Sequence, residues 1–117
     1  MATYQISIAS GSAVSSALQI SPEVTGRAQG TTVALVMPSQ WTAADLLVEG
    51  SLDGTTWFPV YDSFGAPVRI VVDAGRYIVL DSSSSWGLVW MRFRSVAAGG
   101  TSDVNQAASR LLTVIVR

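Results

Sequence analysis

The sequence predicts an all-β fold: a single jelly-roll-like antiparallel β-sandwich of about nine short strands, in one domain that spans residues 1–117. Two observations predict it. Apolar residues recur at every second position along most of the chain, and glycine, proline, aspartate or serine interrupts this pattern at short intervals. A period of two is typical of half-buried strands, and such frequent turn residues are typical of sandwiches. The length suits one hydrophobic core.

The first half of the chain contains five candidate strands. They are residues 3–8, 14–20, 31–37, 45–51 and 57–61. Between the third and fourth, Pro38 suits the first position of a helix, so we expect one short helical turn near Pro38–Asp45, with Trp41 folded back onto the end of the sandwich. Pro59 lacks a backbone N–H, which places the fifth strand at a sheet edge or after a bulge.

The second half contains four more. They are residues 68–72, 76–81, 88–96 and 110–117. Turn residues separate all of these segments, at positions 11–12, 21–22, 30, 53–54, 65–67, 73–75, 82–85 and 99–100. No composition shift or internal repeat divides the chain, so we expect one domain.

The segment "VWMRFRSV" offers two interpretations. Trp90, Arg92 and Arg94 fall on one face of the expected strand, opposite an apolar face. This first face is either a guanidinium and aromatic surface for a partner or sugar, or a set of arginine stems that cover the sheet while their heads meet acidic residues on a neighbouring strand. The second interpretation is favoured.

The segment "VEGSLDGTTWFPVYD" predicts a hairpin. Asp53 and Gly54 lie between two apolar segments, and an Asp-Gly pair readily adopts the positive φ angles of strand-reversing turns. We therefore interpret Asp53 and Gly54 as structural turn residues, with Gly54 at positive φ.

Composition narrows the classes of function. The chain has no cysteine or histidine, its acidic residues are scattered, and its serines have no partner base, so we expect no enzyme, no catalytic residue, no cofactor and no metal. A net charge of −1 argues against nucleic acid as a partner. With no apolar run of spanning length and no signal sequence, we expect no membrane association and synthesis in a cytoplasm.

Two resemblances follow from these motifs. "GSLDGTTW", between "VEG" and "PVYD", resembles the hairpin of discoidin-type sugar- and lipid-binding sandwiches, and "VWMRFRSV" looks like their late strand. Together they cover about a third of the chain, but the cysteines that commonly join the ends of discoidin domains are missing. This resemblance implies a carbohydrate-binding adhesion module.

A second resemblance extends along most of the chain. "MPSQWTAADLLVEGSLDGTTWFPVYD", "DAGRYIVLD", "WMRFRS" and "NQAASRLLTVIVR" are together similar to a family of small structural proteins of tailed bacteriophages. It implies a virion component made in the host bacterial cytoplasm, most simply a capsid decoration protein that binds the major capsid protein or another virion protein. It also implies a homo-oligomer such as a trimer. The alternative is a glycan-binding module on a virion head fibre or tail.

For either role the sequence offers the same candidate contact residues. They lie in the turn after residue 38, on the late strand and in the loop 97–109: Trp41, Trp90, Arg92, Arg94, Asn105 and Gln106. The first and last strands are further candidates, because either could extend the sheet of a neighbour.

Overall fold

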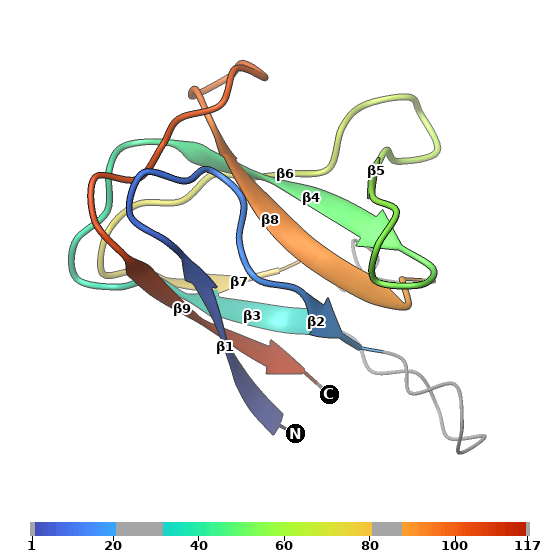
Figure 1. Cartoon of the computed structure of the whole chain (residues 1–117), viewed down its shortest axis with the longest axis horizontal. Coiled ribbons are helices and arrows are strands. Elements are labelled where there is room, and N and C mark those ends of the chain that lie inside the picture. Colours follow the sequence, from blue (N-terminus) through green and yellow to red (C-terminus); the bar gives the residue numbers. More distant parts are fainter. Residues whose placement is uncertain (1, 21–31, 81–87, 117) are drawn as a thin grey trace.

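The computed structural model describes residues 2–20, 32–80 and 88–116, and these form the predicted all-β sandwich. The described part contains nine strands and no helix (Figure 1). The strands are β1 (Ala2–Ile8), β2 (Leu18–Gln19), β3 (Thr32–Val36), β4 (Asp45–Ser51), β5 (Phe58–Pro59), β6 (Arg69–Ile70), β7 (Tyr77–Val79), β8 (Trp90–Val96) and β9 (Arg110–Val116). The predicted turns at 21–22, 30 and 82–85 lie outside the described residues.

Two antiparallel sheets make up the sandwich, in the orders β1-β9-β3-β7 and β2-β8-β4-β5. β6 also pairs with β4, at the end opposite the β5 contact, so β5 and β6 act as one interrupted strand along the same side of β4. Apart from β4, β5 and β6, which share one sheet, consecutive strands lie in different sheets, which agrees with the jelly-roll-like sandwich that the sequence predicts. Pro59 lies on the edge strand β5, as expected.

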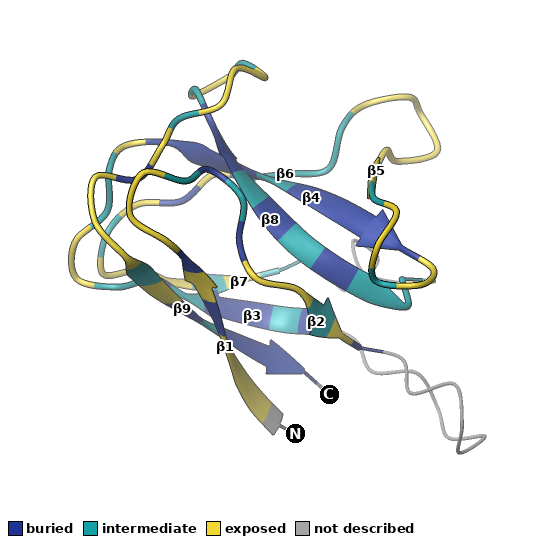
Figure 2. Cartoon of the chain, in the orientation of Figure 1, coloured by how far each residue is buried: buried dark blue, intermediate teal, exposed yellow. Residues whose placement is uncertain are grey.

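The core lies between the sheets and follows the period-two pattern (Figure 2). Phe93 on β8 is fully buried, and it faces Ile6, Leu35 and Leu112 from β1, β3 and β9 of the other sheet. The first and last strands pair along their whole length, so the two ends of the chain lie close together (Figure 1). No helix among the described residues is long and apolar enough to cross a membrane.

The prediction of a short helical turn near Pro38–Asp45 is wrong. In a helical turn, the Pro38 carbonyl would accept the N–H of Thr42. Instead it accepts the N–H of Gly75 (2.8 Å), and the Thr42 N–H donates to Gln106 Oε1 (3.0 Å). The Pro38 carbonyl and the Thr42 N–H are therefore both bonded to residues far away in the sequence, and not to each other. Trp41 nevertheless packs against the core, as expected.

The last strand is not available to a neighbouring sheet. β9 lies between β1 and β3 and pairs with both, so neither of its sides is free. The expectation that residues 110–117 could extend a neighbouring sheet is therefore wrong for the described strand, whereas β1 lies at the edge of its sheet.

Candidate functional site

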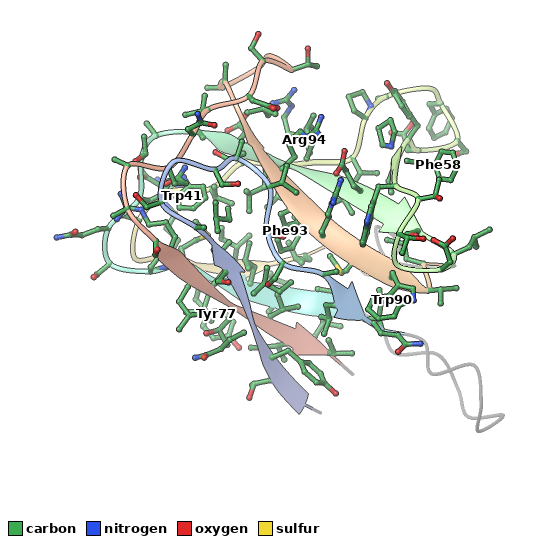
Figure 3. The ribbon with its side chains drawn as sticks, in the orientation of Figure 1. Trp41, Phe58, Tyr77, Trp90, Phe93 and Arg94 are labelled. Atoms are coloured by element: carbon green, nitrogen blue, oxygen red, sulfur yellow. The ribbon has the colours of Figure 1, made fainter. Side chains whose placement is uncertain are left out.

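Four large apolar side chains stand in solvent on β5 and on the connections that flank it. Leu52 is 76 %, Phe58 58 %, Tyr61 58 % and Phe64 94 % exposed. We call residues 52–67, which carry them, the aromatic lobe; it projects from one end of the β2-β8-β4-β5 sheet, and Phe58 lies on its outer side (Figures 1 and 3). Clusters of exposed apolar residues commonly mark contact sites.

Asp53 fixes the first turn of the lobe. Its Oδ1 accepts the N–H groups of Thr55 and Thr56, each at 2.9 Å, and the hydroxyl of Ser51 at 3.0 Å. The N–H groups of Thr56 and then Thr55, followed by the Ser51 hydroxyl, stabilise the carboxylate and hold the pKa of Asp53 well below its ordinary value. The turn is therefore organised by an ionised side chain.

Gly54 lies in this turn at a φ of 82°, as the sequence predicts. A Cβ at this position would meet Cε2 of Trp90 at 3.1 Å, so the Trp90 ring packs directly on the turn. Asp53 has no positive φ, so the turn is not a two-residue hairpin loop of the type in which both central residues are left-handed. Asp53 and Gly54 are structural residues of the turn.

Asp62 organises the second turn of the lobe in a similar way. Its Oδ1 accepts the N–H groups of Phe64 (2.8 Å) and Ala66 (3.0 Å), while the Asp62 N–H donates to the Ala66 carbonyl (2.8 Å). Phe64 thus stands at the tip of a hydrogen-bonded loop. Because both turns are fixed, the exposed apolar side chains are presented without a large ordering cost on binding.

Beside the lobe lies an open hollow of about 810 Å³. It lies between the lobe, β6 and β7, and is lined mainly by apolar residues such as Val60, Val68, Ile70, Ile78 and Leu80. Tyr61 and Phe64 contribute to its wall, so hollow and lobe form one continuous surface.

The arginine-bearing face of β8 matches the favoured interpretation of the sequence. Arg92 Nε donates to Glu49 Oε1 on neighbouring β4 at 2.7 Å, and Arg94 Nη2 lies 3.5 Å from Glu49 Oε2. The Arg92 guanidinium also lies 4.4 Å above the centre of the Trp57 ring. Glu49 is only 6 % exposed, because these side chains cover it.

Other charged side chains on this face also form ion pairs or hydrogen bonds within the chain. Arg69 on β6 contacts Asp45 at 3.0 Å, and the same carboxylate oxygen accepts the Gly99 N–H at 3.1 Å. Arg94 Nε is 3.7 Å from Asp103, beyond hydrogen-bond distance, and is the one buried side-chain N or O atom among the described residues without a hydrogen bond. The face is thus mostly an internal ion-pair network.

The candidate contact residues do not form one site. Trp90, Arg92 and Arg94 are half-buried on β8, Trp41 is half-buried at the other end of the sandwich, and Asn105 is exposed on the loop 97–109 (Figure 3). The structure brings only the three β8 residues together.

Gln106 is fully buried, so the expectation that it contacts a partner is wrong. Its Nε2 donates to the Thr42 carbonyl (3.1 Å) and to Ser95 Oγ (3.0 Å), and its Oε1 accepts from Thr42 N and from Arg110 Nε. All of its polar atoms therefore have partners inside the chain, and it ties the loop 97–109 to the turn after Pro38.

Sequence reasoning did not single out the aromatic lobe. The available signal was "YDSFG", in which an aromatic residue, Phe64, sits directly before the glycine of a predicted turn. A large apolar side chain at a turn has few neighbours to pack against, so this position pointed to exposure.

Comparison with known proteins adds no relative: the chain matches no family model, no curated protein and no solved structure. The resemblances to tailed-phage structural proteins and to discoidin-type sandwiches therefore rest on the sequence motifs alone.

Proposed function

We propose that this chain is a non-enzymatic structural protein of a bacteriophage virion, a capsid decoration protein that attaches to the shell surface through the aromatic lobe. The observation that carries attachment is the exposure of Phe58, Tyr61 and Phe64 on turns held by Asp53 and Asp62. The virion as the location comes from the sequence resemblance.

The chemistry of the lobe supports a protein surface as its target. Its largest exposed side chains are apolar or aromatic, and aromatic residues in rigid positions are common anchors of protein interfaces. The lobe's carboxylates already accept backbone N–H groups, so they have little capacity to bind a polar ligand. A homo-oligomer with its lobes facing one way would attach more firmly than a single copy, through multivalency.

A glycan-binding module is the second candidate, because three exposed aromatic residues on one lobe are also what sugar stacking requires. One feature disfavours it. The ring of Trp57 in the lobe has one face covered by Arg92, and the ring of Trp90 beside the lobe packs on Gly54.

The test is to purify particles from the source, identify this chain by mass spectrometry and locate it by cryo-electron microscopy. Absence from the particles, together with specific glycan binding by the purified chain, would replace the proposal with the second candidate. Presence on the shell with the lobe facing the capsid protein is the expected result.

Substitution of the lobe gives a sharper test. Phe64→Ser should lower attachment of purified protein to stripped particles at least tenfold, while the free energy of unfolding changes by less than about 0.5 kcal/mol, because the side chain is 94 % exposed. Leu111→Ser, an exposed apolar position on the other sheet, is the matched control and should attach normally. Equal attachment of both variants would contradict a role for the lobe.

A further inference from the structure

The β1-β9-β3-β7 sheet ends in two strands that each have one side without a neighbouring strand among the described residues. β7 pairs with β3, and the Leu80 N–H donates to the Val33 carbonyl at 2.9 Å. Backbone groups alternate in direction along an antiparallel strand, so those of Ile78 point toward β3 while those of Tyr77 and Val79 point away. Among the described residues, no hydrogen bond to these outward groups is present.

At the other end of the sheet, β1 also has one side on which no described strand pairs with it. Near its end, the Ser7 carbonyl accepts the Ser16 N–H (2.8 Å), and the Ser7 N–H donates to Ser16 Oγ (3.0 Å). By the same alternation, the backbone groups of Thr3 and Gln5 point to this side as well. Residues 12–16 cover the edge at Ser7, and no described residue bonds to the outward backbone groups of Thr3 and Gln5.

The directions of the strands make these two edges complementary. β1 runs antiparallel to β9, β9 to β3 and β3 to β7, so β1 and β7 run in opposite directions. A second copy in the same orientation presents its β1 to the free side of β7 as the next antiparallel strand. We propose that copies of this chain associate head to tail, with β1 of one copy paired to β7 of the next.

The positions of the free backbone groups fix the register. Thr3 of one copy lies opposite Val79 of the next, and Gln5 lies opposite Tyr77, which gives each pair two backbone hydrogen bonds. Tyr4 then lies opposite Ile78. Its side chain is on the core side of β1, like that of Ile6, and is 44 % exposed in the single copy. In the pair it enters the hollow beside β7, where Ile78 and Leu80 line the wall.

The composition of both edges supports pairing with a second copy. Exposed edge strands are commonly protected by charged residues or proline, and neither β1 ("ATYQISI") nor β7 ("YIV") has one. No like charges therefore meet when the strands pair. Because the two edges differ, the contact is heterologous and produces a closed ring or a filament, according to the rotation between copies. A ring agrees with the oligomer proposed above.

Cysteine substitutions test the contact directly, because the chain has no cysteine of its own. Thr3→Cys and Val79→Cys proteins, mixed and mildly oxidised, should form a covalent dimer on a non-reducing gel, since hydrogen-bonded antiparallel pairs have Cα atoms about 5.5 Å apart, within disulfide range. Neither variant alone should do so. Thr3→Cys mixed with Leu111→Cys, on central strand β9, is the control for contact through the sheet face. No Thr3–Val79 dimer from folded proteins, or equal yield with Leu111, would overturn the proposal.

Proline substitutions test the hydrogen bonds. Val79→Pro and Thr3→Pro each remove one outward N–H and leave the pairing inside the sheet intact, so each should weaken self-association in sedimentation by roughly tenfold. Circular dichroism checks that both variants fold. If Val79→Pro abolishes association and Thr3→Pro has no effect, two β7 strands meet instead and the head-to-tail contact is wrong. A wild-type chain that stays monomeric at millimolar concentration also excludes it.

This inference deepens the proposed function, on which it rests for its role in a shell, and the two are separable by experiment. Particle attachment depends on the aromatic lobe, whereas the cross-link and sedimentation measurements use purified protein alone. Loss of the cross-link with normal attachment would refute the head-to-tail contact and leave the proposed function intact.

Discussion

The outer faces of the two sheets differ in charge and in what covers them. On β4 and β8 the outward side chains include Asp45, Glu49, Arg92 and Arg94, and nearly all of this charge is paired within the chain. On the other sheet the outward strand residues carry no charge: Thr3, Gln5, Ser7, Ala34, Val36, Tyr77, Val79, Leu111, Thr113 and Ile115. One face is stabilised by ion pairs within the chain, whereas the outward strand residues of the other contribute none.

This difference shows that exposed position and charge do not by themselves identify a contact surface. The arginine-rich face looks functional in the sequence, but its guanidinium groups are used to hold β4, β8 and the surrounding loops together. Tyr77 and Val79, which are 65 % and 81 % exposed, have no such internal role. Three changes test the comparison.

The largest effect is expected from Glu49→Ala. It leaves Arg92 and Arg94 without their carboxylate in a partly buried place, which should lower the free energy of unfolding by about 3 kcal/mol. Chemical denaturation measures it. Thr113→Ala, an outward position on the uncharged sheet, is the matched control and should change stability by less than about 0.5 kcal/mol. Equal losses would mean that the two faces do not differ in the way described.

A smaller effect is expected from Gly54→Ala, where the aromatic lobe meets the charged face. Left-handed backbone strain and the approach to the Trp90 ring should together cost about 2 kcal/mol. Gly75→Ala has a similar φ of 69° and open space around its Cβ, so it measures the strain alone, about 1 kcal/mol. Identical melting temperatures for the two variants would show that the packing on Trp90 contributes nothing.

The smallest effect concerns pH. Because folding lowers the pKa of Asp53, its contribution to stability is complete above its ordinary pKa of 3.8 and is lost as the pH falls toward the lower, folded value. We expect a modest fall in melting temperature on acidification below about pH 4 that is larger than the fall in Asp53→Asn. The amide chemical shifts of Thr55 and Thr56 should titrate with it. The same acid dependence in both proteins would assign the effect to other carboxylates.

The fold was predictable because one physical rule, alternation along strands, acts locally. The pattern around Phe93 gave the buried and exposed faces of β8 correctly, and the Asp-Gly pair gave the turn at Gly54. The predictions that failed concern segments whose hydrogen bonds are made with residues far away in the sequence. Gln106 looks exposed in a polar loop, but it captures the backbone of Thr42, a residue far away in the sequence.

The candidate site was less predictable than the fold. Glu49 was visible only as one acidic residue in an apolar strand, and its two arginine partners depend on the register between β4 and β8. The exposure of Phe64 depends on a turn that Asp62 holds out into solvent. The first feature follows from pairing between two strands, which a single sequence does not state, whereas the second depends on hydrogen bonds within the turn itself.

The central place of β9 also bears on how the molecule is made. Among the described strands β1 pairs with β9 alone, and Ala2 meets Val116, so β1 must wait until β9 has been synthesised. During translation its apolar residues stay without their partner strand, and contacts between residues so far apart in sequence are typical of slow folding. The β1-β9-β3-β7 sheet therefore cannot form in full until residues 110–116 have left the ribosome.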